Sequence, residues 1–269
     1  MNRQLYILGL IALQSGFVSP LAMSASANAT PLADISLAQA TVSPLAFNNN
    51  NAPSGFDGQG RPRRRTSGGA RGNCGDRLVA LLPGNDTISD AVSLTDCSLA
   101  STSDLGTTLD SAPTLWFHIP VQERTQNQIN GELVLLDENH QVLALETITL
   151  PSESGIIGIQ LSHPLEVGRS YHWVFSILQH PNSPSQNPTV EGSLRRLTPG
   201  GELRAALETA RNPQARARVL AQQGIWHDAL NELASLRRTE PNNAAVIQDW
   251  ISYLGSVGLD AIATEPLID

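Results

Sequence analysis

The chain has 269 residues, of which 41% are hydrophobic and only 16% are charged, and its formal net charge at pH 7 is −8. An acidic chain is poorly suited to the phosphates of a nucleic acid, so nucleic acid is excluded as a general partner. All 17 basic residues are Arg, which we interpret as a compositional bias rather than a functional signal.

Residues 1–29 have the three-part organisation of a secretory signal peptide. Arg3 supplies the positive charge, residues 5–18 form an apolar stretch, and the small residues up to Ala29 fit the A-x-A cleavage pattern. The apolar stretch is shorter than the about 20 residues that a spanning helix needs. We therefore expect export to the periplasm or the extracellular space, with no membrane span after cleavage. The alternative is an uncleaved N-terminal anchor.

Residues 30–72 form a leader rich in Asn, Pro, Gly and Ser, and this composition predicts disorder because it buries too little apolar surface. The leader contains a basic run made of Arg61, Arg63, Arg64 and Arg65. Such a run can act as a tether to an anionic partner, for example an acidic polymer or lipid headgroups. The alternative is a solvated linker whose charges keep it extended.

The two cysteines of the chain are Cys74 and Cys97. In an oxidising compartment an even pair usually forms a disulfide, and closing a loop of about 22 residues contributes about 3 kcal/mol. The alternative is a pair of free thiols, because no recognised motif requires either position. A metal site is not expected, since there is no CxxC motif and no third ligand nearby.

Residues 73–198 contain short apolar runs separated by turn residues, which predicts strands without intervening helices. The expected strands are residues 78–82, 114–119, 131–136, 142–150, 155–161, 170–178 and 189–196. In the sixth of these, Tyr171, Trp173 and Phe175 alternate with less apolar residues, as in a strand with one buried face. We expect an antiparallel β-sandwich of immunoglobulin or fibronectin type.

Leu165, Gly168 and Tyr171 form an L-x-x-G-x-x-Y string at the entry to the sixth expected strand. The string is similar to the tyrosine corner of immunoglobulin-like sandwiches, in which a Tyr hydroxyl bonds to the backbone a few residues upstream. It predicts a structural role for Tyr171 rather than a role in a binding site.

Residues 199–259 change to a helical periodicity. The spacing of small, aromatic and turn residues is typical of a tetratricopeptide helical hairpin, with packing positions at Ala217, Gly224, Trp226, Ala229 and Pro241. An extra helix is expected within residues 244–256, and residues 260–269 form a tail. A single repeat is too short to bury a continuous core, so we expect it to pack on the sandwich or on a partner.

Several segments occur in an order that resembles one protein family. They are residues 61–74 (RPRRRTSGGARGNC), 78–83 (LVALLP), 113–120 (PTLWFHIP), 150–156 (LPSESGI), 168–175 (GRSYHWVF), 190–196 (VEGSLRR) and 224–230 (GIWHDAL). Together they resemble the exported cyanobacterial domain-of-unknown-function family numbered 928, over most of residues 60–265. The resemblance implies an exported protein without an assigned activity or established catalytic residues. Residues 86–110 are longer and more polar than the family pattern, so the resemblance does not determine a cysteine pairing.

The sequence lacks the common catalytic motifs G-x-S-x-G, HExxH, the P-loop and G-x-G-x-x-G. Its densest polar cluster, Asp137, Glu138 and His140, is typical of a hairpin turn, with a weak cation site as the alternative. We expect no cofactor and no metal. The predicted function is an exported non-enzymatic binding or assembly module that contacts a protein or an envelope polymer. The alternative is a hydrolase with an unrecognised site on the sandwich loops.

Overall fold

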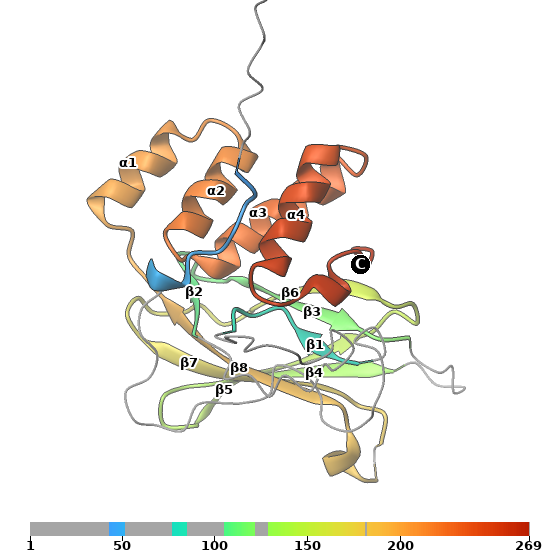
Figure 1. Ribbon diagram of the computed structural model, residues 1–269. Coiled ribbons are helices and arrows are strands. Elements are labelled where there is room, and N and C mark those ends of the chain that lie inside the picture. The colour runs from blue at the N-terminus through green and yellow to red at the C-terminus, as the bar shows by residue number, and fades with distance from the viewer. Residues whose placement is uncertain (1–42, 52–76, 85–104, 122–128, 181, 269) are drawn as a thin grey trace, which may run out of the picture. The chain divides into compact units, whose positions relative to one another are not determined.

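The computed structural model describes residues 43–51, 77–84, 105–121, 129–180 and 182–268 (Figure 1). Several sequence predictions lie outside these ranges. They are the signal peptide, the basic run from Arg61 to Arg65, and both Cys74 and Cys97 with their predicted disulfide.

The described chain is mainly β, with two sheets followed by four helices (Figure 1). One sheet has the order β1-β3-β6 and consists of β1 (Val79–Ala80), β3 (Thr114–Ile119) and β6 (Gly155–Gln160). The other has the order β2-β8-β7-β4-β5 and consists of β2 (Gly106–Thr108), β8 (Thr189–Arg196), β7 (Ser170–Ile177), β4 (Asn130–Leu136) and β5 (Val142–Thr149). The helices are α1 (Gly201–Thr209), α2 (Pro213–Gln222), α3 (Trp226–Thr239) and α4 (Ala244–Gly255). Short 3-10 turns occur at Asn49–Asn51, Pro184–Gln186 and Asp260–Ile262.

The two sheets enclose an apolar core that follows from the alternation of side chains along their strands. In β7, Tyr171, Trp173 and Phe175 are buried while the residues between them are half-buried. Phe117 of β3 lies edge-on to Trp173, with ring centroids 5.4 Å apart, and 4.4 Å from the ring of Phe175. Aromatic contacts of this kind join one sheet to the other.

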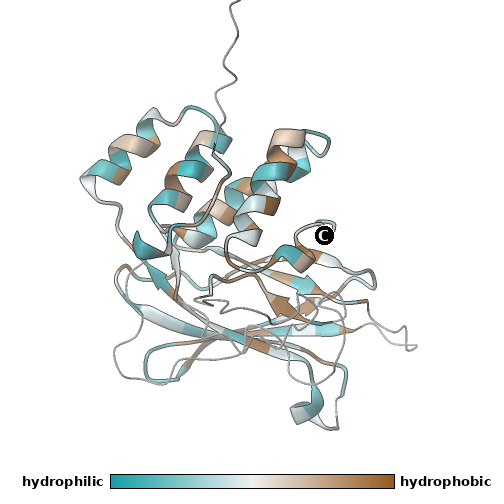
Figure 2. Ribbon diagram, in the orientation of Figure 1, coloured by the Kyte–Doolittle hydropathy of each residue, from teal (hydrophilic) through white to brown (hydrophobic). Residues whose placement is uncertain are grey.

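The three-stranded sheet is buried on both faces. In β3, Leu115 and Phe117 belong to the core between the sheets, whereas Trp116 belongs to a second core that the helices share. The helices carry alternating hydrophilic and hydrophobic bands (Figure 2), so each presents an apolar stripe to that second core. The helical segment therefore packs on the sheet, which is one of the two arrangements expected for a repeat too short to stand alone.

The prediction of an entirely antiparallel sandwich is wrong for one strand pair. Strand β2 pairs in parallel with β8, with Gly106 opposite Leu194 and Thr108 opposite Arg196. The Gly-Thr-Thr sequence of β2 has no apolar alternation to reveal it. Its threonines are nevertheless fully buried, because Thr107 Oγ1 bonds to the start of α3. Tertiary contacts rather than local sequence thus make this strand.

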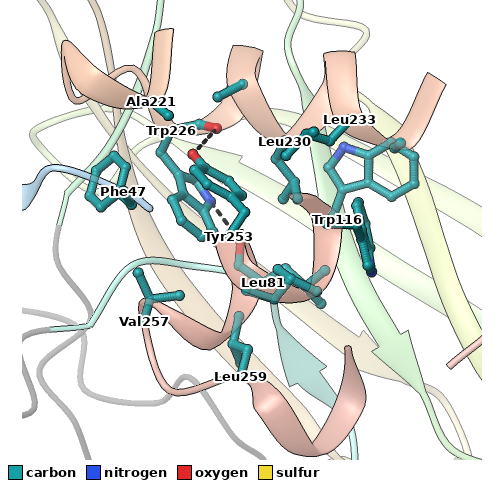
Figure 3. Packing of buried hydrophobic residues seen from close by; sticks show 14 of the residues in the cluster. Phe47, Leu81, Trp116, Ala221, Trp226, Leu230, Leu233, Tyr253, Val257 and Leu259 are labelled. Carbon is teal, nitrogen blue, oxygen red and sulfur yellow. Dashed lines mark hydrogen bonds between the residues drawn. The ribbon is translucent and has the colours of Figure 1, made fainter. Parts of the chain in front are cut away.

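Trp226 is the centre of the helical core (Figure 3). Its indole Nε1 donates to the Leu81 carbonyl beside β1 over 2.9 Å, and its own carbonyl accepts from the Tyr253 hydroxyl of α4 over 3.2 Å. Its ring stacks on that of Tyr253 with centroids 4.7 Å apart. Phe47, far upstream in the sequence, meets the indole edge-on at 5.0 Å. One side chain therefore joins the first sheet, two helices and the segment around Phe47.

Replacing Trp226 by Phe removes the buried bond to Leu81 and leaves that carbonyl without its partner. We expect the free energy of unfolding to fall by about 2–3 kcal/mol, from the lost hydrogen bond and the smaller ring. Tyr253→Phe removes a single hydroxyl and should cost about 1 kcal/mol. Urea denaturation followed by far-UV circular dichroism measures both values. One buried hydrogen bond is worth about 1 kcal/mol. A loss in the free energy of unfolding below about 0.5 kcal/mol for Trp226→Phe would therefore contradict this description of the core.

Candidate functional site

The residues of the predicted tyrosine corner lie close together. Leu165 and Tyr171 are buried, and Gly168 has a φ of 82°, a left-handed conformation that favours glycine. The backbone N–H of Glu166 donates to the Tyr171 hydroxyl over 2.8 Å. These residues stabilise the turn into β7, and none of them lines the cavity described below.

The predicted repeat positions fall on α2, α3 and the turns that follow them. Ala217, Trp226 and Ala229 are completely buried. Gly224 has a φ of 72° in the turn between α2 and α3, and the half-turn after α3 contains the exposed Pro241. The three buried positions therefore pack between the helices, whereas Pro241 is exposed.

The polar cluster at residues 137–140 is a hairpin turn between β4 and β5. Asp137 Oδ1 accepts the backbone N–H groups of Asn139 and Gln141 over 2.8 and 2.9 Å. These bonds lower the pKa of the Asp137 carboxyl, and the bond from Gln141 has the largest effect. Within the described ranges no group of three His, Cys, Asp or Glu side chains is placed to hold a metal ion.

The candidate site is a cavity of about 330 Å³ where the end of β2 meets the helices. Its charged and imidazole or amide side chains come from two distant parts of the sequence: Asp110 follows β2, and the others belong to α2 and α3. Those groups are Arg216, His227, Asp228, Asn231 and Glu232. None of the six was predicted as a site residue.

Hydrogen bonds between side chains and the backbone hold the two sides of this cavity together. Thr107 Oγ1 donates to the Gly224 carbonyl and accepts the backbone N–H of Trp226 over 3.2 Å. Two residues later, the Leu109 N–H donates to the Asp228 carboxylate over 3.1 and 3.2 Å. The end of β2 is thereby fixed to the first turn of α3.

Burial raises the pKa of the Asp228 carboxyl from 3.8 to about 6. Hydrogen bonds from the Thr108 side chain and the Leu109 backbone oppose this shift, while the negative charge of Asp110 adds to it. Asp228 is therefore mostly ionised at pH 7, but its charge is poorly compensated.

His227 is 1% exposed, and burial lowers its pKa to about 3, against a small opposing effect from the Thr114 backbone. Apart from that Thr114 backbone interaction, which falls short of full hydrogen-bond geometry, neither ring nitrogen has a partner in the described part of the chain. The ring is consequently neutral at pH 7 and adds no positive charge to the cavity.

The one cation in the cavity lining, Arg216, already has a partner. Its Nε lies 3.0 Å from Glu232 Oε1. Among the described residues, neither Asp110 nor Asp228 forms an ion pair with a basic side chain. The cavity therefore contains two carboxylates that form no ion pair within the described chain, of which Asp110 is exposed and accepts the Ala112 N–H.

A second polar cluster lies at the other end of the three-stranded sheet. Ser154 Oγ is 3.3 Å from His118 Nε2 and 3.4 Å from Glu265 Oε2. His118 Nδ1 lies 2.9 Å from the Arg77 carbonyl, which requires a proton on Nδ1 and leaves Nε2 as an acceptor. Burial lowers the pKa of His118, although the Arg77 backbone and the Glu265 charge raise it.

Sequence patterns carried little information about either cluster. The i, i+4 spacing of Asp228 and Glu232 places both carboxylates on one face of a helix, and this is the one local signal that was available. Asp110 and Ser154 reach their clusters through strand pairing between distant segments, which no local pattern encodes.

Substituting Asp228 by Asn tests the electrostatic description of the cavity, because the amide oxygen can still accept the Leu109 N–H. The folded-state pKa of Asp228, about 6, exceeds the ordinary value of 3.8. The contribution of this carboxyl to the stability of the fold is therefore fully present below about pH 4, and it is lost as the pH rises through 6. We expect Asp228→Asn to unfold like the wild type at pH 4 but to be more stable by roughly 2 kcal/mol at pH 7.5.

Urea denaturation at four pH values between 4 and 7.5 measures this difference. Glu208→Gln, an exposed carboxylate of α1 outside the cavity, is the control and should not alter the pH profile. A stability difference independent of pH would contradict the raised pKa. Because both proteins contain His227 and His118, the effects of these residues cancel in the comparison.

Comparison with known proteins places the chain in a family. A family model described as Domain of Unknown Function (DUF928) matches residues 64–267, whereas no curated protein matches. Among solved structures, a β-glucuronidase from Parabacteroides merdae, with glycerol in its active site, aligns at 9% identity and a TM-score of 0.22. That alignment covers 68% of this chain and 28% of the enzyme's chain. The chain belongs to the DUF928 family.

Proposed function

We propose that the protein is an exported, non-enzymatic binding or assembly module, and that its cavity between β2 and α3 binds a positively charged group of a partner protein. The observation that carries this proposal is the pair of carboxylates, Asp110 and Asp228, neither of which forms an ion pair within the described chain. Export is inferred from the signal-like organisation of residues 1–29.

The electrostatics of the cavity favour a cation over a neutral or anionic ligand. An ammonium or guanidinium group beside Asp228 would offset the cost of its partly buried charge. His227 stays neutral and does not repel such a group. A volume of about 330 Å³ is at the small end for ligand sites, so it suits one side chain rather than a large cofactor.

The surrounding scaffold is of a kind that suits protein recognition. We propose that α2 and α3 form a tetratricopeptide-like hairpin, which the left-handed Gly224 between them supports. We also propose an immunoglobulin- or fibronectin-like sandwich, supported by the Glu166 N–H to Tyr171 hydroxyl bond. The cavity lies where these two parts meet, and a partner could contact both.

A second candidate function is hydrolysis at the loop between β5 and β6. One observation favours it: Ser154 Oγ lies 3.3 Å from the acceptor nitrogen of His118, as in a serine–histidine pair. Glu265 is on the Ser154 side of the ring, 3.9 Å from Nε2, whereas the orienting carboxylate of a triad bonds to Nδ1. The same bonds also explain a structural role, because they attach the C-terminal segment to the sheet.

Binding is tested with blocked tri-lysine and tri-arginine peptides, and with a blocked tri-glutamine peptide as the neutral probe. Isothermal titration of the chain from residue 30 onward at pH 7.5 should show binding of the cationic peptides and none of the neutral one. We expect Asp110→Asn/Asp228→Asn to weaken binding at least tenfold, since both carboxylates that attract the ligand are removed.

Glu202→Gln/Glu208→Gln is the matched control, because it removes the same number of negative charges from exposed positions of α1. Affinity should stay unchanged in this variant. If both double variants bind equally, the cationic peptides respond to net charge alone, and the cavity is not their site. Absence of any peptide binding would overturn the proposed ligand class.

The hydrolase candidate is tested with a fluorophosphonate probe, which labels activated serines. We expect no labelling of the wild-type chain, in keeping with a binding module. Labelling that disappears in Ser154→Ala but persists in Ser152→Ala, its neighbour in the same loop, would favour the hydrolase instead.

A further inference from the structure

Strand β5 has one hydrogen-bonding edge against β4, and within the described residues no strand pairs with its other edge. It is eight residues long, as long as β7 or β8. Proteins usually protect such edges with Lys, Pro, bulges or charges, because free backbone groups are a template for another strand. The sequence of β5, VLALETIT, contains no Lys, Arg, Pro or Gly.

The outward face of β5 carries two large apolar side chains, beside the exposed Thr147 and Thr149. Val142 and Leu145 are 60% and 58% exposed and account for two of the four exposed large hydrophobic side chains of the described chain. Leu145 lies opposite Val134 of β4, which in turn lies opposite Val174 of β7. An apolar row therefore crosses three strands and ends at the free edge.

The single charge of β5 does not oppose pairing at that edge. Glu146 lies opposite the buried Leu133, so its side chain is on the inner face of the sheet. Its carboxylate accepts the Ser162 backbone N–H over 2.9 Å and the Ser162 hydroxyl over 2.7 Å. Because this charge is bound within the chain, β5 itself presents no free charge at the edge, and the nearest outward carboxylate is Glu132 of β4, opposite Thr147.

We propose that β5 pairs with β5 of a second copy of the chain, antiparallel and with Leu145 opposite Leu145 on a two-fold axis. Antiparallel self-pairing is compatible with a closed two-fold dimer. A two-fold centre at Glu146 would oppose two carboxylates, and one at Thr147 would pair Leu145 with Thr149. Only the centre at Leu145 brings the exposed leucines together and places Glu146 opposite Ala144.

This arrangement would join two five-stranded sheets into one continuous sheet. A second copy fits this edge because each presents the same uncharged backbone and the same apolar side chain. The net charge of −8 on each chain is screened beyond about 8 Å at physiological salt, so contact at a neutral edge is not prevented. The dimer does not involve the Asp228 cavity and is independent of the proposed ligand.

Sedimentation velocity of the chain from residue 30 onward, between 1 and 100 µM, tests the proposal. We expect a dimer whose dissociation constant rises at least tenfold in Leu145→Lys, since a charge is placed on the two-fold axis. Val167→Lys is the matched control, because Val167 is 51% exposed but lies in the turn before β7. This variant should dimerise like the wild type.

Hydrogen exchange on the wild-type chain provides a second readout that needs no substitution. Amides of residues 142–149 should become more protected as the concentration rises from 1 to 100 µM. A chain that remains monomeric at 100 µM overturns the proposal. So does a dimer that survives Leu145→Lys without added protection of β5, because it must use another surface.

Discussion

The indole of Trp226 is held by the surface of a sheet that has no free face. Strands β1, β3 and β6 have the sheet core on one side and the helical core on the other. The helices share their core with Val79, Trp116 and Ile156 of this sheet. The Trp226 bonds to Leu81 and Thr107 set where α3 begins. Asp228, two residues into the helix, then reaches the Leu109 N–H. The cavity is thus a consequence of how the helical core is anchored.

Burial acts on the two neighbouring residues of α3 in opposite directions. It raises the pKa of Asp228 and lowers that of His227, and in both cases it favours the neutral form. At pH 7 the outcome differs, because His227 is fully neutral whereas Asp228 retains most of its charge. The cavity therefore keeps an uncompensated negative charge at neutral pH.

Elements that depend on local sequence signals could be predicted, whereas those that depend on contacts between distant segments could not. Strands β3 and β8 occupy the predicted ranges 114–119 and 189–196, because their apolar content and flanking turn residues are local signals. Strand β2 was not predicted, since the burial of Thr107 depends on a bond to Gly224 more than a hundred residues away. The candidate site was not predicted for the same reason. Asp110 and Asp228 are brought together by that same strand, so missing β2 meant missing the cavity.

The contact between Phe47 and Trp226 has a consequence for the order of folding. Phe47 precedes both sheets, yet it packs on Trp226 and Tyr253, and the Asn48 N–H donates to the Ala221 carbonyl. A chain that emerges from its N-terminus cannot bury Phe47 until α4 has appeared. Contacts of such long sequence separation slow folding. During synthesis, therefore, Phe47 stays exposed until nearly the whole of the described chain has been made.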